Sequence, residues 1–538
     1  MCGGNHYETG SFEIKMGIMK KDLTTYVYDF EELIKGNFLY VDKTEYVWNL
    51  IRPRSEGYFL SRPRRFGKSL LVSTLEAIFQ GKKDLFQGLA IYDKPYGWKV
   101  YPVIHLSLAD YSVVSNALDE LPGYLMSKMR SLAKEHAISL TEKTPALCFA
   151  ELIDSLSSKE KVVILIDEYD KPILNNITDK NVNEILKCLK GFYSVLKDRN
   201  KQERLLFITG VSKFSHVSLF SELNNLTDIT LDADYSGMLG FTDAEVRTYF
   251  ADWIPEAAKV NNVTEDKLMA NVLEWYDGYR FSEADIHVCN PVSVSTFFQK
   301  KFRFSNYWDS TGTPSFLMEL MRKQSYNFEA ALNGTYDESI FAAYELERLD
   351  ITGLLWQTGY LTIKELVPGL RRMKYRLDFP DYEVEDTFMT RLLEYFCDLP
   401  QGTGEDTIEE FQKNIANDDL NGFLTLFQSF LANIPYSIHL KHEKYYQTVF
   451  FIFFRLLGLF IKAESQTNQG RIDAYIRTAK TIYIFEFKLD KSPDEALEQI
   501  IDRRYYEKFQ SCGLPIRMVG VNFDSTKGQI DDWKECCS

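Results

Sequence analysis

The chain has 538 residues, of which 45% are hydrophobic and 16 are proline, and its formal net charge is −15. This length exceeds what a single hydrophobic core usually supports, so we expect several domains, and the composition excludes a disordered or fibrous protein. The negative charge excludes a surface coated with cations and restricts any nucleic-acid contact to a local basic groove. From about Lys441 onward basic and acidic residues nearly balance, so the C-terminal end repels a polyanion least.

The sequence contains no signal for a zinc-binding, disulfide-bonded or membrane-spanning protein. Its eight cysteines are scattered without CxxC spacing, which predicts neither a zinc site nor a disulfide framework. Residues 1–15 lack the apolar segment of a signal peptide, and the longest apolar run, 449–461, contains Arg455 and is too short to span a bilayer. We therefore expect a soluble, cytoplasmic protein without membrane contact, and an oligomer is compatible with the sequence.

The first half alternates short apolar runs with helical patterns, which predicts an α/β fold with a mainly parallel sheet flanked by helices. The expected strands are residues 57–60, 103–108, 162–166, 205–209 and 228–231. Residues 242–299 have a helical pattern typical of a lid, and residues 344–395 fit a small winged-helix-like unit. The predicted organisation is a first domain at 20–240, a helical and winged-helix-like region at 241–400, a linker at 401–420 and a last domain at 421–538.

An apolar strand, a loop and a helix start follow one another between Tyr58 and residue 72. Phosphate binding requires backbone N–H groups in a concave loop, a lysine for the terminal phosphates and a hydroxyl for Mg²⁺. Gly67, Lys68 and Ser69 supply these groups, and we also expect Arg65 to contact the nucleotide. The usual spacing, GxxxxGK(S/T), has a glycine where this chain has Arg62, so an exposed lysine at a helix start is the alternative.

Paired acids follow the aliphatic strand 162–166 and strengthen the prediction of a nucleotide site. In P-loop NTPases the first acid helps to hold Mg²⁺ and a following glutamate orients the attacking water, which would be the roles of Asp167 and Glu168. The alternative is a set of solvated loop acids, which is the more usual explanation for Asp170. Thr209, after a third strand, is placed where such folds sense the γ-phosphate, although a structural turn explains it equally well.

Four segments together resemble the bacterial AAA-ATPase-like family, whose members commonly carry a C-terminal domain of the PD-(D/E)XK nuclease superfamily. They are Tyr-Val-Asp-Lys-Thr at 40–44, Arg-Pro-Arg-Arg-Phe-Gly-Lys-Ser at 62–69, Asp-Glu-Tyr-Asp at 167–170 and Trp-Tyr-Asp-Gly-Tyr-Arg at 275–280. The resemblance covers nearly the whole chain and implies a P-loop NTPase fold followed by a restriction-endonuclease-like α/β domain. The family's phosphate loop shares the Arg-Pro-Arg-Arg run, so the missing glycine marks this family.

Independently of that resemblance, residues 471–478 and 481–488 form two strands joined by a two-residue turn. Antiparallel pairing through this turn places Asp473 opposite Glu486, and Lys488 shares the face of Glu486 because side chains alternate with period two. Opposed carboxylates with Cβ atoms about 5 Å apart repel each other and need a cation. Mg²⁺ or Mn²⁺ suits such oxygen ligands, and Lys488 could position the attacking water or stabilise developing charge.

This Asp-x(12)-Glu-x-Lys spacing matches the PD-(D/E)XK pattern, with Ile472 in place of the proline. The surrounding elements have the superfamily's order: a helix at 441–457, strands at 460–465, 471–478 and 481–488, a helix at 493–509 and a strand at 516–523. The resemblance implies that Glu443 is a further acidic ligand and that Gln499 and Tyr505 lie near the site. A solvated hairpin with incidental charges is the alternative.

Together these sites predict an ATP-binding P-loop ATPase with a Mg²⁺-dependent nuclease domain, in which nucleotide state controls access to nucleic acid, with DNA as the expected substrate. The competing hypothesis is a nucleotide-dependent switch or scaffold whose C-terminal domain binds nucleic acid or a partner without cutting it. The intact set of Asp473, Glu486 and Lys488 favours the enzyme.

Overall fold

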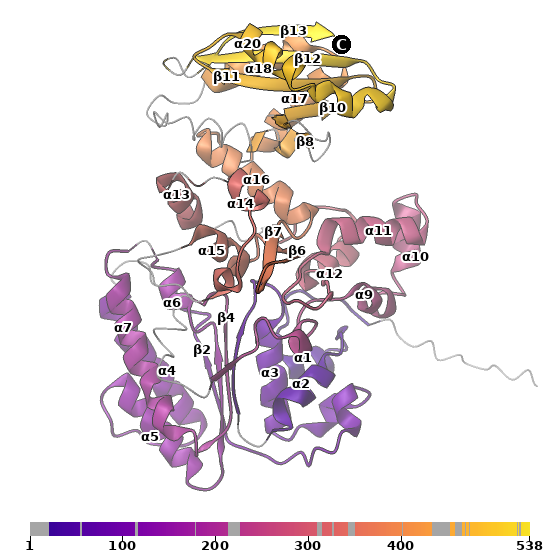
Figure 1. Ribbon diagram of the computed structural model, residues 1–538. Helices are drawn as coiled ribbons and strands as arrows, with labels where there is room; N and C mark the ends of the chain where they lie inside the picture. The colour runs from indigo at the N-terminus through magenta and orange to yellow at the C-terminus, as the bar shows by residue number, and fades with distance from the viewer. Residues whose placement is uncertain are drawn as a thin grey trace, which may run out of the picture.

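A computed structural model gives the arrangement of the chain. It describes residues 21–53, 56–112, 117–177, 179–213, 226–308, 315–324, 326, 328–342, 350–400, 402–432, 452–453, 455–457, 465–467, 470–472, 474–524, 526 and 529–537. Three blocks follow one another from bottom to top in Figure 1: an α/β block, a mainly helical middle and a C-terminal block built on a second sheet. None of the helices in these ranges is long and apolar enough to cross a lipid bilayer.

The N-terminal block is built on a five-stranded, all-parallel sheet with the order β2-β3-β4-β1-β5. The strands are β1 (Glu56–Ser61), β2 (Val103–Ser107), β3 (Val162–Asp167), β4 (Glu203–Gly210) and β5 (Leu226–Asp228). Every residue of β3 and β4 is buried, as expected for central strands covered on both faces. The first four predicted strands are confirmed. The fifth ends earlier than predicted, because Asp228 Oδ1 accepts the N–H of Thr230 and turns the chain.

Helices cover both faces of this sheet, and each face has its own hydrophobic cluster. One face carries α1 (Phe30–Lys35), α2 (Thr44–Ile51), α3 (Lys68–Phe79), η1 (Lys83–Phe86) and η2 (Ala90–Asp93). The other carries α4 (Ala117–Glu135), α5 (Pro145–Ser157), α6 (Lys171–Leu174), α7 (Val182–Tyr193) and η3 (Ser194–Arg199). The predicted doubly covered α/β architecture is confirmed, and it brings the carboxyl ends of β1, β3 and β4 to one edge.

The middle block is helical, as predicted, and continues into a helix–hairpin–helix unit. Its first part contains η4 (Ala233–Tyr235), α9 (Asp243–Tyr249), α10 (Ile254–Val260), α11 (Glu265–Tyr276) and α12 (Pro291–Gln299). Its second part contains α13 (Ser315–Lys323), α14 (Phe328–Asn333), η5 (Glu338–Phe341), α15 (Ile351–Thr358), the antiparallel strands β6 (Thr362–Pro368) and β7 (Met373–Asp378), and α16 (Tyr382–Phe396). This block lies between the two sheets in Figure 1.

Most of the predicted linker at 401–420 is a helix, α17 (Gly404–Ala416), that packs against its neighbours. Its buried side chains are Ile408, Phe411 and Ile415, which recur at helical spacing and therefore form one apolar face. Phe411 contacts Phe423 of α18 (Leu420–Ala432) at a ring-centroid distance of 5.5 Å and Phe453 at 4.5 Å. The segment was interpreted as a linker from its Gly, Asp, Glu and Asn content, but those residues lie on the exposed face and at the ends.

The C-terminal block contains a four-stranded mixed sheet with the order β10-β11-β12-β13. Its elements are the short strands β8 (Ser465–Thr467) and β9 (Gly470–Ile472), then β10 (Ala474–Arg477), β11 (Ile482–Leu489), α20 (Pro493–Asp502), η7 (Tyr505–Cys512), β12 (Ile516–Asp524) and β13 (Gln529–Cys537). The predicted order of elements is confirmed in the described part, and β13 adds an antiparallel edge strand that the sequence did not predict. Of the predicted helix 441–457, only residues 452–453 and 455–457 are described, and these are helical.

We predict that Phe411→Ala lowers the free energy of unfolding by about 3–5 kcal/mol, because it removes a fully buried aromatic ring from the junction of α17 and α18. Urea denaturation followed by fluorescence measures this change. The neighbouring exposed residue provides the matched control, and Glu410→Ala should change stability by less than about 0.5 kcal/mol. A flexible linker would instead tolerate both substitutions and would be cleaved by proteases within 404–416.

Candidate nucleotide and metal sites

The loop between β1 and α3 has the backbone of a phosphate-binding loop. Gly67, the residue before the helix, has φ 90°, a left-handed conformation that favours glycine, and Arg65 is also left-handed at φ 68°. The N-cap residue of α3, Gly67, supplies no side-chain cap, so among the described residues the first turn has no capping acceptor. A twelve-residue helix that begins with free N–H groups attracts an anion.

Lys68 lies across this loop. Its Nζ donates to the carbonyl oxygens of Arg62 at 3.0 Å and Pro63 at 2.9 Å, and the residue is 5% exposed. Burial lowers the pKa of Lys68, while the charges of Glu168 and Asp167 oppose that change. The ammonium group is therefore held inside the loop, where phosphate oxygens could replace the two carbonyls. The alternative of an exposed lysine at a helix start is wrong.

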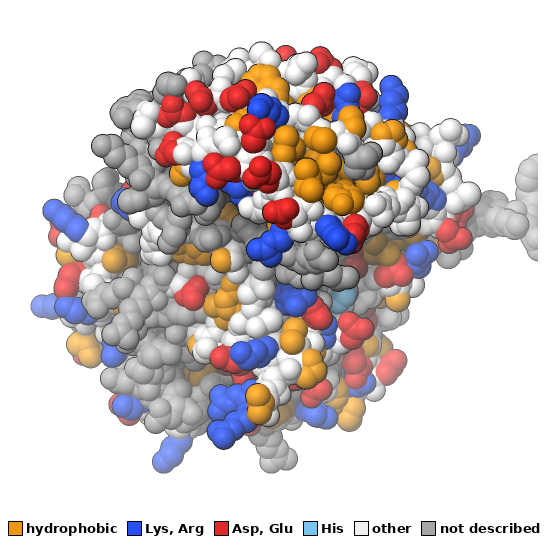
Figure 2. Space-filling model, turned by 45° about the horizontal axis from the view of Figure 1, so that its top comes forward, with side chains coloured by type: hydrophobic (Ala, Val, Ile, Leu, Met, Phe, Trp, Pro, Cys, Tyr) orange, Lys and Arg blue, Asp and Glu red, His pale blue; other side chains and the backbone are white. Residues whose placement is uncertain are grey.

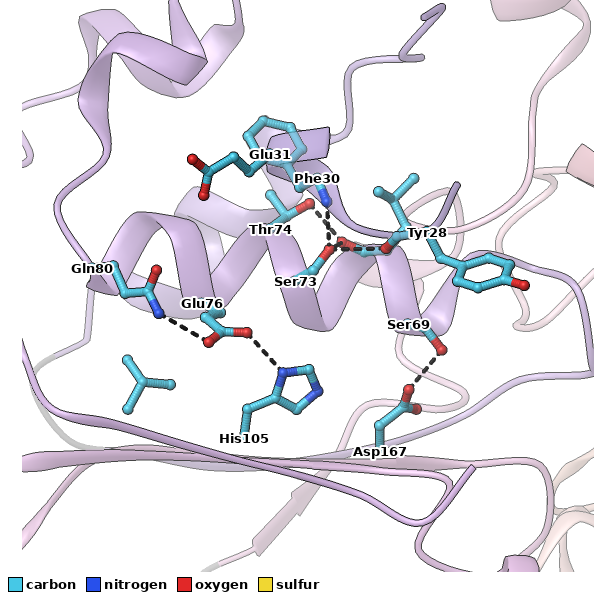
Figure 3. A network of polar contacts seen from close by, with 12 residues as sticks. Tyr28, Phe30, Glu31, Ser69, Ser73, Thr74, Glu76, Gln80, His105 and Asp167 are labelled. Carbon is cyan, nitrogen blue, oxygen red and sulfur yellow. Dashed lines mark hydrogen bonds and ion pairs between the residues drawn. The ribbon is translucent and has the colours of Figure 1, made fainter. Parts of the chain in front are cut away.

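Ser69 and Asp167 meet at the junction of α3 and β3 (Figure 3). Ser69 Oγ donates to Asp167 Oδ2 at 2.6 Å. The other oxygen, Asp167 Oδ1, is buried and has no hydrogen-bond partner among the described residues. Burial raises the pKa of Asp167, and the Ser69 hydroxyl partly offsets this. A hydroxyl beside a buried carboxylate with an unused oxygen fits Mg²⁺, which takes oxygen ligands.

Glu168 follows directly and has the strained backbone of many functional residues. Its φ is 51°, which is unusual for a residue with a side chain. The carboxylate lies 3.4 Å from Nζ of Lys171 and is partly exposed. The role of Glu168 in orienting the attacking water stays a prediction.

Two residues predicted to contact the nucleotide, Thr209 and Arg65, have other hydrogen-bond partners in this structure. Thr209 is fully buried, and its hydroxyl donates to the carbonyl of Leu60 at 2.8 Å, so it links β4 to β1 instead of facing a phosphate. Arg65 Nη1 donates to the carbonyl of Tyr307 at 2.8 Å and therefore points toward the middle block. Sequence position alone could not give these directions, because both depend on neighbours distant in the chain.

Arg62, which stands in place of the usual glycine, turns away from the phosphate side. Its Nη1 donates to the carbonyls of Ser61 at 2.9 Å and Thr230 at 2.7 Å, and its guanidinium lies 4.2 Å from the ring centroid of Phe281. Burial lowers the pKa of Arg62 to about 9. The side chain thus fixes the start of the loop without occupying it.

The C-terminal site consists of three residues that contact each other on β11 and α20. Lys488 Nζ donates to Glu486 Oε1 at 2.9 Å and to Gln499 Oε1 at 2.5 Å, and Gln499 Nε2 donates to Glu486 Oε1. Glu486 is 2% exposed, so its charge lies in a desolvated setting. The alternative of incidental surface charges is wrong for Glu486. Tyr505 is instead buried in an apolar cluster.

A close approach of α20 to the sheet makes these contacts possible. Glu486 pairs with Gly520 of β12, and a Cβ atom at Gly520 would lie 2.2 Å from the carbonyl oxygen of Pro493, so only glycine fits there. The described pairs of the hairpin, Ala474 with Phe485 and Arg477 with Ile482, follow the predicted register. The predicted ligands Asp473 and Glu443 lie outside the described residues, and no cluster of three metal-binding side chains occurs among those described.

Comparison with known proteins agrees with both sites. A family model described as a predicted AAA-ATPase matches residues 25–220, and a PD-(D/E)XK nuclease superfamily model matches residues 441–533. A protein of Azotobacter chroococcum mcd 1, named as an uncharacterized protein in the vnfD 5′ region, is 35% identical over 516 residues, which is 94% of this chain and 96% of the relative. The chain belongs to the AAA-ATPase-like family. The N-terminal part of this AAA-ATPase-like protein carries the phosphate loop, and its C-terminal part carries the nuclease-superfamily domain.

Sequence reasoning missed the structural role of the second half of the Asp-Glu-Tyr-Asp segment in the AAA-ATPase-like protein. Asp170 is 1% exposed, and its Oδ2 accepts the N–H and the hydroxyl of Ser212 at 2.7 Å each and the N–H of Val211 at 3.1 Å. Tyr169 donates its hydroxyl to the carbonyl of Ser212 at 2.8 Å. These two residues fix the loop after β4 beside the acids of β3, so Asp170 is not a solvated loop acid.

Polar residues on α3 were also missed, although their spacing gave a signal. In Figure 3, Glu76 points toward the sheet on the same side as Ser69, as a spacing of seven residues predicts, and Ser73 points toward Phe30 and Tyr28. Ser73 Oγ accepts the N–H of Phe30 at 2.9 Å, and Glu76 contacts His105 of β2 at 2.7 Å. The contacts hold α3 in the rotation that directs Ser69 at Asp167.

We predict that Asp170→Ala destabilises the AAA-ATPase-like protein by about 3–5 kcal/mol, because it leaves buried donors of Val211 and Ser212 without an acceptor. Asp170→Asn keeps one acceptor oxygen and should cost clearly less. Thermal unfolding measures both variants. Equal stability of Asp170→Ala and the wild type would show that these hydrogen bonds do not hold the loop.

Proposed function

We propose that this protein binds Mg²⁺·ATP at its phosphate loop and that its C-terminal domain cleaves phosphodiester bonds of nucleic acid, DNA being the substrate that we favour. The observation that carries the proposal is that each site contains a buried carboxylate that accepts a hydrogen bond from a polar side chain. Asp167 accepts from Ser69, and Glu486 accepts from Lys488. Burying a charge is costly unless a cation or hydrogen bonds compensate it. Such pairs are therefore typical of sites that bind charged ligands.

At the phosphate loop, each group has a separate role in the proposal. The N–H groups at the start of α3 would bind phosphate oxygens, and Lys68 would exchange its two carbonyl acceptors for the terminal phosphates. Ser69 and Asp167 would hold Mg²⁺, which supplies neutralisation of charge on the phosphate groups. Glu168 would orient the attacking water and accept its proton.

At the C-terminal site, the side chains would position a water against a phosphodiester. Glu486 would hold a divalent cation together with Asp473 and Glu443, and the cation supplies Lewis-acid stabilisation of the phosphate. Lys488 is placed to orient the water or to donate to the negative charge that develops in the transition state. Gln499 keeps Lys488 and Glu486 in fixed positions, since its amide contacts both.

The surface around the C-terminal domain limits how nucleic acid could bind. On the face drawn in Figure 2, acidic side chains gather over the upper part of the molecule, a group of hydrophobic side chains lies beside them, and lysine and arginine are interspersed. This distribution favours a local contact with nucleic acid near the site and disfavours an extensive electrostatic interface. A switch or scaffold whose last domain binds a partner without cutting it is the competing function, and the cleavage test below separates the two.

We predict that Lys68→Ala lowers ATP affinity by about 10- to 100-fold, because it removes a charged hydrogen bond to phosphate. Isothermal titration with Mg²⁺·ATP measures this change. Lys35→Ala, on an exposed lysine of α1, is the control and should bind as the wild type does. Glu168→Gln should retain binding and slow any hydrolysis. Unchanged ATP affinity in a folded Lys68→Ala protein would refute the proposed nucleotide site.

We predict that Asp473→Ala, Glu486→Gln and Lys488→Ala each slow metal-dependent cleavage of duplex or single-stranded oligonucleotides by about 100- to 10,000-fold. EDTA should abolish cleavage, and Mg²⁺ or Mn²⁺ should restore it. Lys491→Ala, a control on the exposed lysine three residues beyond Lys488, should cleave normally. Nucleic-acid binding without cleavage in the wild type would favour the scaffold.

A further inference from the structure

The outward side chains of the phosphate loop are held by the middle block. Arg65 donates to the carbonyl of Tyr307 at 2.8 Å, and Phe66 packs edge-on against Tyr279 with ring centroids 4.7 Å apart. Pro63 fits against Gly359 at the end of α15, where a Cβ atom would lie 2.6 Å from Cβ of Pro63. The loop therefore cannot change shape without moving its neighbours in the middle block.

The Tyr307 contact depends in turn on α16. Glu383, the second residue of this helix, is fully buried, and its Oε1 accepts the N–H of Trp308 at 2.6 Å and also that of Tyr307. Burial raises the pKa of Glu383, and its backbone hydrogen bonds act against that change. Glu383 thus fixes the backbone whose carbonyl holds Arg65, which makes it a positioning residue for the phosphate loop.

The opposite face of α16 contacts the C-terminal domain. Glu385 accepts a hydrogen bond from Nε of Arg455, and Nη2 of the same arginine lies 3.3 Å from Oδ1 of Asp378. Arg455 belongs to the segment that matches the nuclease superfamily. Glu385 is 14% exposed and Arg455 32%, so this ion pair is partly desolvated and stronger than a surface pair.

Two residues along a helix span about 3 Å of its axis and about 200° of rotation. Glu383 and Glu385 therefore lie at nearly the same height and face opposite directions, one toward the phosphate loop and one toward the C-terminal domain. A helix is rigid over so short a distance, so a shift or rotation at one contact is transmitted to the other.

We propose that α16 is the relay through which the phosphate loop and the C-terminal domain influence each other, with Glu383 as the contact to the loop and the Glu385–Arg455 pair as the contact to the nuclease domain. This inference rests on the proposed function, because it assigns a means of regulation to the same two sites. Binding of Mg²⁺·ATP would rearrange Arg65 and its acceptor, and α16 would carry the change to Arg455. By linkage, occupation of the C-terminal domain would change ATP affinity by the same factor.

The experiment uses the full chain and measures hydrogen–deuterium exchange of β11 and α20 with and without Mg²⁺·ATP. ATP should change exchange in these elements by about fivefold or more in the wild type, the lower end of typical coupling. Glu385→Gln and Arg455→Gln should each remove the effect while ATP still binds. Arg455→Lys, which keeps a cation between Glu385 and Asp378, should retain the effect, which a merely structural role of the guanidinium does not predict.

The matched control is the ion pair of Arg376 with Glu365 on the β6–β7 hairpin, at 2.6 Å and half-exposed, which touches neither site. Glu365→Gln should leave the ATP effect intact. Glu383→Ala should weaken ATP binding, whereas Glu383→Gln retains an acceptor oxygen for the two N–H groups and should bind more tightly than the alanine variant.

The outcomes separate failure of the relay from failure of the proposed function. If ATP binds the wild type and exchange in β11 and α20 does not change, or if the effect survives in Arg455→Gln, the relay is overturned while the nucleotide site stands. If ATP does not bind the wild type, the titration itself refutes the nucleotide site, and the relay falls with it. An ATP effect without cleavage in any assay would support the relay and refute the nuclease.

Discussion

The hydrogen bond between Ser69 and Asp167 is the contact on which the nucleotide site depends, because it joins the first turn of α3 to the carboxyl end of β3. The strand that leads into α3, β1, is not a neighbour of β3 in the sheet, since β4 lies between them. The junction therefore requires a correctly ordered parallel sheet, α3 at one rotation, and a loop of fixed shape. The contacts of Ser73, Glu76 and Asp170 serve these requirements, each by fixing one element against another.

Both sites bury charge, and this shared property connects the fold to its chemistry. Lys68, Asp167 and Glu486 are each at most 5% exposed. A stable core gains little from such groups, because their desolvation offsets their mutual attraction. Lys68 and Asp167 lie beside the start of α3, and Glu486 lies beside the side-chain amide of Gln499. Because such desolvated charges add little to stability, their positions favour a role in ligand binding.

The sequence predicted the parts of the fold that local patterns determine. Short runs of apolar residues predicted β3 and β4, and a two-residue turn with period-two alternation predicted the register of the β10–β11 hairpin. The directions of side chains were harder to predict. A place in the phosphate loop suggests a nucleotide contact for Arg65, and a place at the end of the third strand suggests one for Thr209. Their hydrogen-bond acceptors nevertheless belong to Tyr307 and Leu60. In α17, polar composition concealed an apolar stripe that periodicity would have shown.

Arg62 has a consequence for how fast and how tightly the loop can bind. A glycine at this point would leave the loop many conformations, and a ligand would have to select one of them at a loss of entropy. The arginine instead anchors the loop to Thr230 and Phe281 during folding, so its ordering is complete before any phosphate arrives. Association should then be limited by encounter and by the release of Lys68 from its carbonyl partners. Preorganisation in this sense concerns the start of the loop at Arg62, while the rearrangement proposed for Arg65 lies further along it.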